Sequence, residues 1–387
     1  SLLQMAYNAA LALGEAREHE AVDLVERVNA NIHPILYIPK DIAIAKKVAK
    51  MKEAYKAAKD YSHEIVQVMV NYVDVDQKVA IANSEGLYTE DRRIRTRFAV
   101  QAIASDGKEN QTGYEAPGKS MGFELFDKID AAKCGREASR IAVTMLHAPL
   151  CPSGKMVGAI DNGFGGVIFH EACGHSLEAT SVAKGNSEFA EKLGQKIASD
   201  KVTVIDDGTL PNEWGSLNID DEGNPTRKNV LIEKGILKGY MIDKLNGRRM
   251  NMEPTGSSRR QSYRFAPTSR MTNTYIAPGD DDNETIIKSI DYGLYAKKMG
   301  GGSVNPVTGE FNFAVLEGYL VKNGKIDTPV RGATLIGKGS EILQRIDMVG
   351  KELDLAAGMC GSISGSVPTN VGQPLIRVSE ITVGGRE

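Results

Sequence analysis

Two histidines and a glutamate lie within six residues of one another in the segment 170–175, which reads HEACGH. Imidazole nitrogens and carboxylate oxygens bind transition-metal ions, and a glutamate beside such an ion can act as a general base. The apolar run at 166–169 precedes the segment and can bury one side of it. His170 and His175 are therefore candidate metal ligands, and Glu171 is the candidate catalytic base.

The spacing of the two histidines differs from the spacing that suits two ligands on a regular helix. Residues at i and i+4 lie about 40° apart around an α-helix, whereas residues at i and i+5 diverge by about 140°. His170 and His175 have the wider spacing, so the helix must widen or break between them to let both bind one ion. Gly174 tolerates such backbone geometry. The sequence therefore predicts a distorted turn at Cys173 and Gly174.

Two histidines leave a catalytic zinc site one ligand short, because such sites usually have three protein ligands and one open position. Cys360 is our candidate for the third ligand. It lies in the Gly-rich segment 357–362, where small neighbours let the backbone approach closely, and a thiolate is a strong zinc ligand. Cys173 is the weaker alternative, since such a cysteine is more often a small buried hydrophobe. The alternative to these assignments is that the His–Glu pair occurs by chance and that the segment binds no metal.

Peptide hydrolysis is the chemistry that this set of residues suggests. With zinc in place, Glu171 would take the proton of the water molecule that attacks a carbonyl carbon. The reaction also needs a group that stabilises the developing oxyanion. Arg259, Arg260 and Tyr263 are candidates on residue type alone.

Composition and charge exclude other classes of protein. Hydrophobic residues make up 41% and charged residues 25% of the 387 residues, which is ordinary for a folded globular protein. Lys and Arg total 47 against 50 for Asp and Glu, so no positive excess exists to neutralise phosphates, and we expect no direct nucleic-acid partner. The longest apolar runs fall far short of the roughly 20 residues of a membrane span. We expect no membrane association.

Cysteine usage and the first residues bear on the cellular compartment. The four cysteines lack the dense spacing of a disulfide scaffold, and no secretory signal pattern opens the chain. We therefore expect a cytoplasmic protein. The chain begins at Ser1 inside a helical stretch and without an initiator Met, so we also expect a further segment upstream.

The elements that must position these residues fall into two parts. An Ala- and Lys-rich run at 43–61 predicts a long surface helix. Partly alternating β-branched patterns predict an antiparallel meander, with strands at 64–73, 78–83 and 94–104. A second helix is expected at 122–145, interrupted near Cys134 and Gly135. These features predict an N-terminal α/β domain with antiparallel strands and long helices.

A turn-rich segment at 149–154, with two prolines, a serine and a glycine, marks the best domain boundary. We place an N-terminal domain at 1–149 and a C-terminal domain at 150–387. Short strands joined by tight turns are expected in the second domain, at 202–205, 230–233, 237–242 and 317–321. The predicted class is α+β, with a mostly antiparallel β C-terminal domain that carries the metal-motif helix.

The segment 170–178, HEACGHSLE, closely resembles the HEAxGHxLE motif of the TldD/PmbA family, whose members were once described as modulators of DNA gyrase. The resemblance continues in the same order through further motifs, at 204–209, 220–225, 230–240, 254–256, 270–274, 300–302, 360–361, 372–374 and 383–385. It covers at least residues 150–387. The metal motif is typical of the TldD-like subunit and is absent from the PmbA-like subunit, also called TldE.

This resemblance implies a zinc metallopeptidase in which His170, His175 and Cys360 bind the ion and Glu171 catalyses. It also implies an α+β fold whose curled antiparallel sheets carry the site. TldD-like proteins cut unfolded or extended peptides in the cytoplasm together with a PmbA/TldE-like subunit. We therefore expect a peptide substrate and either such a partner or a homodimer. The alternative is a non-catalytic regulatory or binding protein, acting on gyrase or a toxin–antitoxin pair, with a structural metal or none.

Overall fold

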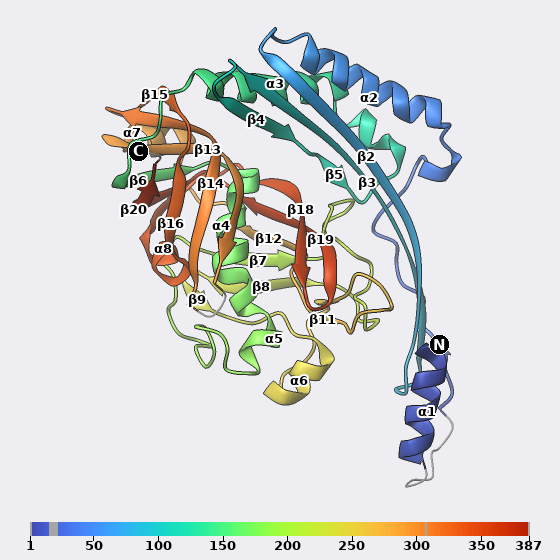
Figure 1. Cartoon of the computed structure of the whole chain (residues 1–387). Coiled ribbons are helices and arrows are strands. Elements are labelled where there is room, and N and C mark those ends of the chain that lie inside the picture. Colours follow the sequence, from blue (N-terminus) through green and yellow to red (C-terminus); the bar gives the residue numbers. More distant parts are fainter. Residues whose placement is uncertain (1, 15–21, 306–307, 386–387) are drawn as a thin grey trace.

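The computed structural model describes residues 2–14, 22–305 and 308–385 (Figure 1). Helices and strands both contribute, and most strand pairs are antiparallel, which confirms the predicted α+β class. Within these ranges no helix combines the length and the apolar character that a membrane span requires. The structure begins with helix α1 (Leu2–Gly14) and continues into an N-terminal layer and a larger C-terminal body.

The N-terminal layer is a five-stranded sheet covered on one face by two long helices (Figure 1). Its centre is the antiparallel hairpin of β2 (Ile65–Ala82) and β3 (Leu87–Ser105). Three short strands also pair with β3: β1 (Val25–Glu26), β4 (Asn110–Glu115) and β5 (Gly118–Lys119). The helices α2 (Ile44–Lys59) and α3 (Ala131–His147) bury a core of their own with the sheet.

The hairpin differs from the predicted meander, because the expected strands at 64–73 and 78–83 form one continuous strand. The polar residues between them stay paired with β3 throughout, from Asp74 opposite Thr96 to Gln77 opposite Arg93. The two aspartates did not end the strand, because Asp74 pairs with Lys47 of α2 and Asp76 pairs with Arg92 of β3.

The predicted helix interruption near Cys134 and Gly135 is wrong. A short 3-10 turn, η2 (Phe123–Asp127), precedes α3, and the break lies just before Ala131. Asp130 starts the helix, since its carboxylate accepts a hydrogen bond from the Lys133 N–H at 2.9 Å. Gly135 lies inside the helix, where a Cβ would come within 2.3 Å of the Ala54 carbonyl oxygen. This glycine therefore permits close packing of α3 on α2.

The C-terminal body contains two large sheets. The six-stranded sheet has the order β18 (Asp354–Ser362), β19 (Gly365–Gln373), β12 (Asn273–Ile276), β7 (Val204–Asp207), β8 (Lys228–Glu233) and β9 (Ile236–Leu237). The seven-stranded sheet has the order β13 (Tyr292–Val304), β6 (Gly154–Ile160), β20 (Ile376–Gly384), β16 (Thr334–Lys338), β14 (Glu310–Lys322) and β15 (Lys325–Val330), with β17 (Ile346–Val349) beside β20. β13 also pairs with β14, so this sheet curls round on itself.

Shorter elements complete the fold: η1 (Pro39–Asp41), α6 (Lys244–Met250), β10 (Ser258–Arg259), β11 (Thr268–Ser269), α7 (Asn283–Lys288) and α8 (Gly339–Arg345). The segment that carries the metal motif comprises η3 (Gly163–Gly166), α4 (Val167–Phe169), η4 (His170–Gly174), η5 (His175–Leu177) and α5 (Ala179–Val182). It lies between the two sheets, with η4 touching β12 on one side and β13 and β14 on the other (Figure 1).

Two glycines let this segment pack directly against backbone. A Cβ on Gly166 would lie 2.5 Å from the Gly372 nitrogen in β19, and a Cβ on Gly339 would lie 2.3 Å from the Ala172 carbonyl oxygen. The apolar side chains of α4 and η4 are buried in the main core of the body. These contacts fix the position of the metal motif relative to β19 and α8.

Candidate metal centre

The structure brings together the three residues that we predicted as metal ligands. One ligand atom from each of His170, His175 and Cys360 lies within 4.8 Å of the others. The Cys360 Sγ atom is 3.2 Å from His170 Nε2 and 3.3 Å from His175 Nε2. Zinc bonds of about 2.0–2.3 Å in tetrahedral geometry place neighbouring ligand atoms roughly 3.5 Å apart. The donor set and its spacing therefore fit one zinc ion.

The backbone between the two histidines has the distortion that their spacing requires. Residues 170–174 form a single turn of π-helix, and the His175 N–H donates to the His170 carbonyl oxygen five residues earlier. This confirms the predicted distorted turn. Gly174 lies in close contact with Met271, whose sulfur would be 2.4 Å from a Cβ at this position. The wider turn rotates His175 towards the side of the helix that carries His170.

Cys360 is held as a thiolate by its two histidine neighbours. Burial alone would raise the pKa of this thiol, but His170 and then His175 outweigh burial and lower it from 9.0 to about 4. Burial would lower the pKa of His175, whereas Glu178 and the Cys360 thiolate raise it well above 6.5. In the absence of an ion the charge of the thiolate is thus balanced by a proton on His175, and a metal ion would replace that proton.

The weaker candidate, Cys173, has a different environment. It is buried with its sulfur directed at α8, where a Cβ on Gly339 would lie 2.9 Å away. Burial raises its pKa well above 9.0, so it is a neutral thiol. It is not part of the described group of potential metal ligands.

Glu171 lies beside the site and is accessible to solvent. Its Oε2 atom is 3.7 Å from His175 Nε2, and its side chain is 32% exposed. By contrast, the side chain of His175 is 16% exposed and Cys360 is almost fully buried. A carboxylate at the solvent-facing side of a metal site is well positioned to accept a proton from an incoming water molecule.

Two charged residues to which we assigned no role from the sequence support the site. Glu178 Oε2 is 3.2 Å from His175 Nδ1 and so fixes the orientation of that ring. Arg270 is fully buried, and its Nε atom is 3.9 Å from Glu178 Oε1. Its guanidinium group also donates to the carbonyl oxygens of Cys360 and Gly365. Arg270 and Glu178 therefore connect the helix that carries His175 to the strand that carries Cys360.

Both residues lie in the family-like motifs of the sequence, at 170–178 and 270–274, but only Glu178 also has a local spacing signal. Glu178 follows His175 by three residues, which is a spacing at which helical side chains meet. Arg270 is separated from both partners by at least 90 residues, and only the fold brings it near them.

The three oxyanion candidates have other contacts. Arg259 is buried and donates to the carbonyl oxygens of Met271 and Pro368. Arg260 donates through its side chain to the Phe265 carbonyl oxygen, and Tyr263 is 69% exposed. Among the described residues no hydrogen bond joins these side chains to the candidate ligands. An oxyanion role for any of them stays a prediction.

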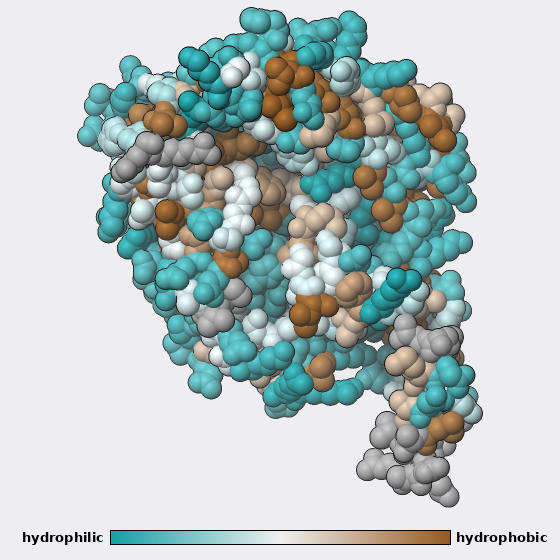
Figure 2. Space-filling view, in the orientation of Figure 1, coloured by the Kyte–Doolittle hydropathy of each residue, from teal (hydrophilic) through white to brown (hydrophobic). Residues whose placement is uncertain are grey.

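A cleft of about 750 Å³ lies between the N-terminal layer and the body and reaches the strand that carries Cys360. It runs between α3, β4 and β5 of the N-terminal layer and β13 and β18 of the body, and its lining includes Met359, the residue before Cys360. Apolar side chains such as Ile129, Phe164 and Leu316 line much of it. Figure 2 shows apolar surface in the hollow between the upper layer and the body.

Comparison with protein families gives two matches that together span most of the chain. The PmbA/TldA metallopeptidase central domain matches residues 37–146, and the PmbA/TldA metallopeptidase C-terminal domain matches residues 153–385. These two segments lie on either side of the turn-rich segment at 149–154.

Several curated proteins are similar over nearly the whole chain. The metalloprotease TldD homolog of Buchnera aphidicola from Acyrthosiphon pisum is 38% identical over 93% of this chain and 76% of its own length. The corresponding homolog of Haemophilus influenzae is 40% identical over 92% and 74%. A zinc metalloprotease TldD homolog of Saccharolobus solfataricus is 28% identical over 93% and 82%.

Solved structures share the fold at low sequence identity. A Thermotoga maritima protein described as a proposed modulator of a DNA gyrase superposes with a TM-score of 0.81 at 22% identity, covering 98% of this chain and 83% of that one. TldE from Thermococcus kodakarensis gives a TM-score of 0.75 at 21% identity, covering 96% and 82%.

Proposed function

This chain is a metallopeptidase of the PmbA/TldD family, and we propose that it hydrolyses unfolded or extended peptides with a zinc ion bound by His170, His175 and Cys360. The observation that carries the proposal is the convergence of these three ligand atoms within 4.8 Å. Two nitrogen donors and one sulfur donor suit zinc, and three protein ligands leave a tetrahedral position for water or substrate.

The residues of the chain have distinct tasks in this proposal. Cys360 supplies a thiolate, and Glu178 holds the ring of His175 in the orientation that directs Nε2 at Cys360 Sγ, so that both atoms would hold the ion. Bound zinc supplies a Lewis acid that polarises the substrate carbonyl group and acidifies water. Glu171 accepts the proton of the attacking water molecule and passes it to the leaving amine.

The cleft beside Met359 supports an extended polypeptide as the substrate. Its volume of about 750 Å³ is enough for several residues of an extended chain but far below that of a folded domain. Its apolar lining favours segments with hydrophobic side chains, which folded proteins bury and unfolded proteins expose.

Three further statements belong to the same proposal. The chain works with a PmbA/TldE-like subunit or with a second copy of itself, for which the fold shared with a protein named TldE gives support. It acts in the cytoplasm, consistent with its four free cysteines. Two domains divide near residue 150, as the separate cores of the N-terminal layer and the body suggest.

Replacing the proposed base tests the mechanism. We expect Glu171→Gln to lower peptide turnover by about 10²–10⁴-fold while the bound metal stays near the wild-type amount, because the amide cannot take up a proton. Turnover of a fluorogenic unstructured peptide and elemental analysis of the same sample measure the two quantities. Chelator treatment should abolish activity and added zinc should restore it.

The control for this experiment is Glu233→Gln, which removes a carboxylate on the exposed side of β8 that pairs with Lys238. It should cleave the peptide at the wild-type rate. Full activity of Glu171→Gln with bound zinc would exclude Glu171 as the base, and activity that resists metal removal would contradict the zinc proposal as a whole.

A further inference from the structure

The strand that carries Cys360 depends on contacts from outside its own sheet. β18 is at the end of the six-stranded sheet, and among the described strands it pairs only with β19. Cys360 lies two residues before the end of β18, next to a turn in which Ile363 is 71% exposed. The ligands of a metal site must be held within about 0.5 Å of their working geometry, so further contacts must fix this part of β18.

Two side chains hold β18 just before Cys360. Trp214 Nε1 donates to the Gly358 carbonyl oxygen at 2.8 Å, and Arg97 donates to the Ala357 carbonyl oxygen at 3.0 Å. The guanidinium group of Arg97 also lies over the Trp214 ring, 5.7 Å from its centroid, so each side chain supports the other. Because Trp214 is only 5% exposed, water has little access to compete for its hydrogen bond.

Close packing leaves these two side chains little freedom to move. Gly118 of β5 lies against both of them: a Cβ at this position would be 3.1 Å from the Trp214 ring and 3.2 Å from both Arg97 Cγ and Ala357 Cβ. The glycine therefore lets β5, β3, β18 and the loop that carries Trp214 meet closely.

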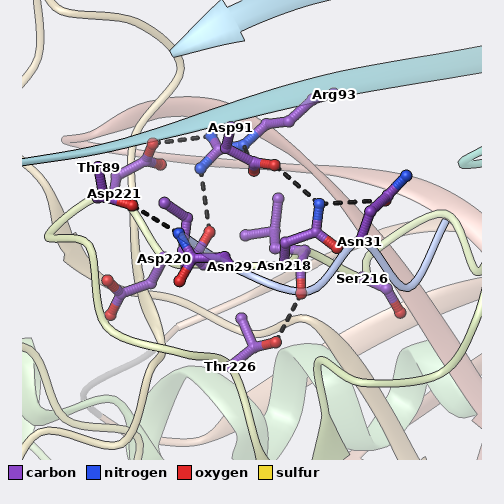
Figure 3. Close-up of polar contacts among 12 residues, drawn as sticks. Asn29, Asn31, Thr89, Asp91, Arg93, Ser216, Asn218, Asp220, Asp221 and Thr226 are labelled. Atoms are coloured by element: carbon purple, nitrogen blue, oxygen red, sulfur yellow. Dashed lines mark hydrogen bonds and ion pairs between the residues drawn. The ribbon is translucent and has the colours of Figure 1, made fainter. Parts of the chain in front are cut away.

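The loop that carries Trp214 is itself fixed to the N-terminal layer. It spans residues 208–227, between β7 and β8, and the Trp214 carbonyl oxygen accepts a hydrogen bond from Arg95 of β3 at 3.3 Å. Figure 3 shows a second link, in which Arg93 Nη1 of β3 lies 2.8 Å from Asp221 Oδ1 of the same loop. Both side chains that hold β18 are thus anchored on β3.

We propose that Trp214 and Arg97 are positioning residues of the metal centre, which hold β18 at the place where Cys360 Sγ reaches both histidines. The inference rests on the proposed zinc site. Both residues act through the backbone of β18 rather than through contact with the ion. Loss of either contact should let Cys360 move away from the histidines and weaken metal binding.

Trp214→Phe is the main variant, because phenylalanine keeps an apolar ring in the same space but cannot donate to Gly358. We expect the dissociation constant of the full chain for zinc to rise about 2–10-fold, the effect of losing one hydrogen bond between neutral groups. Arg97→Lys should also weaken zinc binding, since lysine lacks the planar group that donates to Ala357 and stacks on Trp214. Competition with a chromophoric chelator, without substrate, measures the affinities.

Cobalt(II) bound in place of zinc gives a second measurement, because its absorption spectrum depends on the geometry and type of its ligands. The thiolate charge-transfer band should shift or weaken in Trp214→Phe, since Cys360 moves relative to the two histidines. A substitution that only lowers the stability of the fold should leave the spectrum of the bound cobalt unchanged.

The matched control is Arg140→Gln. Arg140 of α3 pairs with Glu317 of β14 at 2.8 Å, a contact between the same two parts of the molecule that involves β14 rather than β18. This variant should have the zinc affinity and the cobalt spectrum of the wild type. An equal loss of affinity in Arg140→Gln would overturn the proposal, because general loosening of the layer would then explain the result.

Unchanged zinc affinity and an unchanged cobalt spectrum in Trp214→Phe and Arg97→Lys would also overturn it. If Trp214→Phe fails to fold, as circular dichroism will reveal, Arg97→Lys decides the question. Weaker binding in these variants would support the inference even if the wild-type chain cleaved no peptide, an outcome that contradicts the proposed function alone. A wild-type chain that binds neither metal would overturn both.

Discussion

At the scale of single residues, the environment of each cysteine determines its chemistry. Two imidazoles lower the pKa of Cys360 to about 4, whereas burial raises that of Cys134 and of Cys151 to about 11. Cys173 is also shifted upwards by burial. Of the four cysteines, Cys360 is thus the one with a thiolate, which is the form that binds zinc.

This contrast predicts selective alkylation of the metal-free protein. Cys360 is deprotonated above about pH 4, so its reaction rate with iodoacetamide should change little between about pH 6 and 8. Thiols with raised pKa stay protonated and slow over that range. Mass spectrometry of proteolytic fragments measures each site, and added zinc should protect Cys360. A rate at Cys360 that rises tenfold per pH unit would contradict a thiolate.

Glu178 is a positioning residue whose replacement should act through the metal. We expect Glu178→Gln to weaken zinc binding about 10–100-fold, since His175 loses the carboxylate that orients its ring and increases its basicity. Competition with a chromophoric chelator measures the affinity, and saturating zinc should restore part of the activity. Glu233→Gln serves again as the control. An unchanged zinc affinity would show that the contact with His175 has no such role.

At the scale of elements, the metal motif depends on a short helix with an irregular turn held between two sheets. The π-helical turn at 170–174 and the close approach of Gly166 to β19 together direct both histidines at Cys360. Irregular helical turns are rarely stable alone, and here the packing on both sides stabilises this one.

Gly166→Ala should therefore destabilise the protein. Its Cβ would lie 2.5 Å from backbone of Gly372, which cannot rotate away, so α4 or β19 must shift. We expect a loss of about 1–3 kcal/mol in the free energy of unfolding, measured by urea denaturation, with lower metal content. Gly301→Ala is the control, because a Cβ there meets no atom within 4 Å. Equal stability of both variants would contradict this explanation.

At the scale of the whole molecule, the N-terminal layer forms one wall of the cleft that runs along β18 as far as Met359. Arg97 of β3 donates to the Ala357 carbonyl oxygen, and Trp214 donates to that of Gly358, so β18 is held just before Cys360. The layer, through Arg97, therefore helps to position the strand that carries one of the proposed ligands.

If peptides bind in this cleft, as we propose, its size predicts a preference for unfolded substrates. A small disulfide-bonded protein should resist cleavage when folded and be cut once it is reduced and alkylated, because only the unfolded chain fits a cleft of about 750 Å³. Electrophoresis and mass spectrometry measure the cleavage rates of the two forms, which contain the same peptide bonds. Equal cleavage rates for the two forms would contradict selection by the cleft.

The sequence by itself determined the local features. The histidine spacing and Gly174 predicted the distorted turn, and the amphipathic and β-branched patterns predicted the long helix α2 and the α+β class. The prediction from local pattern was wrong at Gly135. We expected this glycine to interrupt the helix, but it lies inside α3 and permits close packing on α2. The reason is that backbone preference and periodicity depend on residues close together in the sequence, whereas packing depends on residues that the fold brings together.

Only the tertiary structure decided which distant groups meet. Cys360 was proposed from glycine-rich surroundings and from the family motif, but its distance of 3.2 Å from His170 depends on β18 lying against the buried helix. Arg270 lies in the family-like motif at 270–274, but nothing in the sequence indicated that it meets Glu178 and the Cys360 carbonyl group. That role arises because folding removes a charged side chain from water and makes it depend on partners far away in the chain.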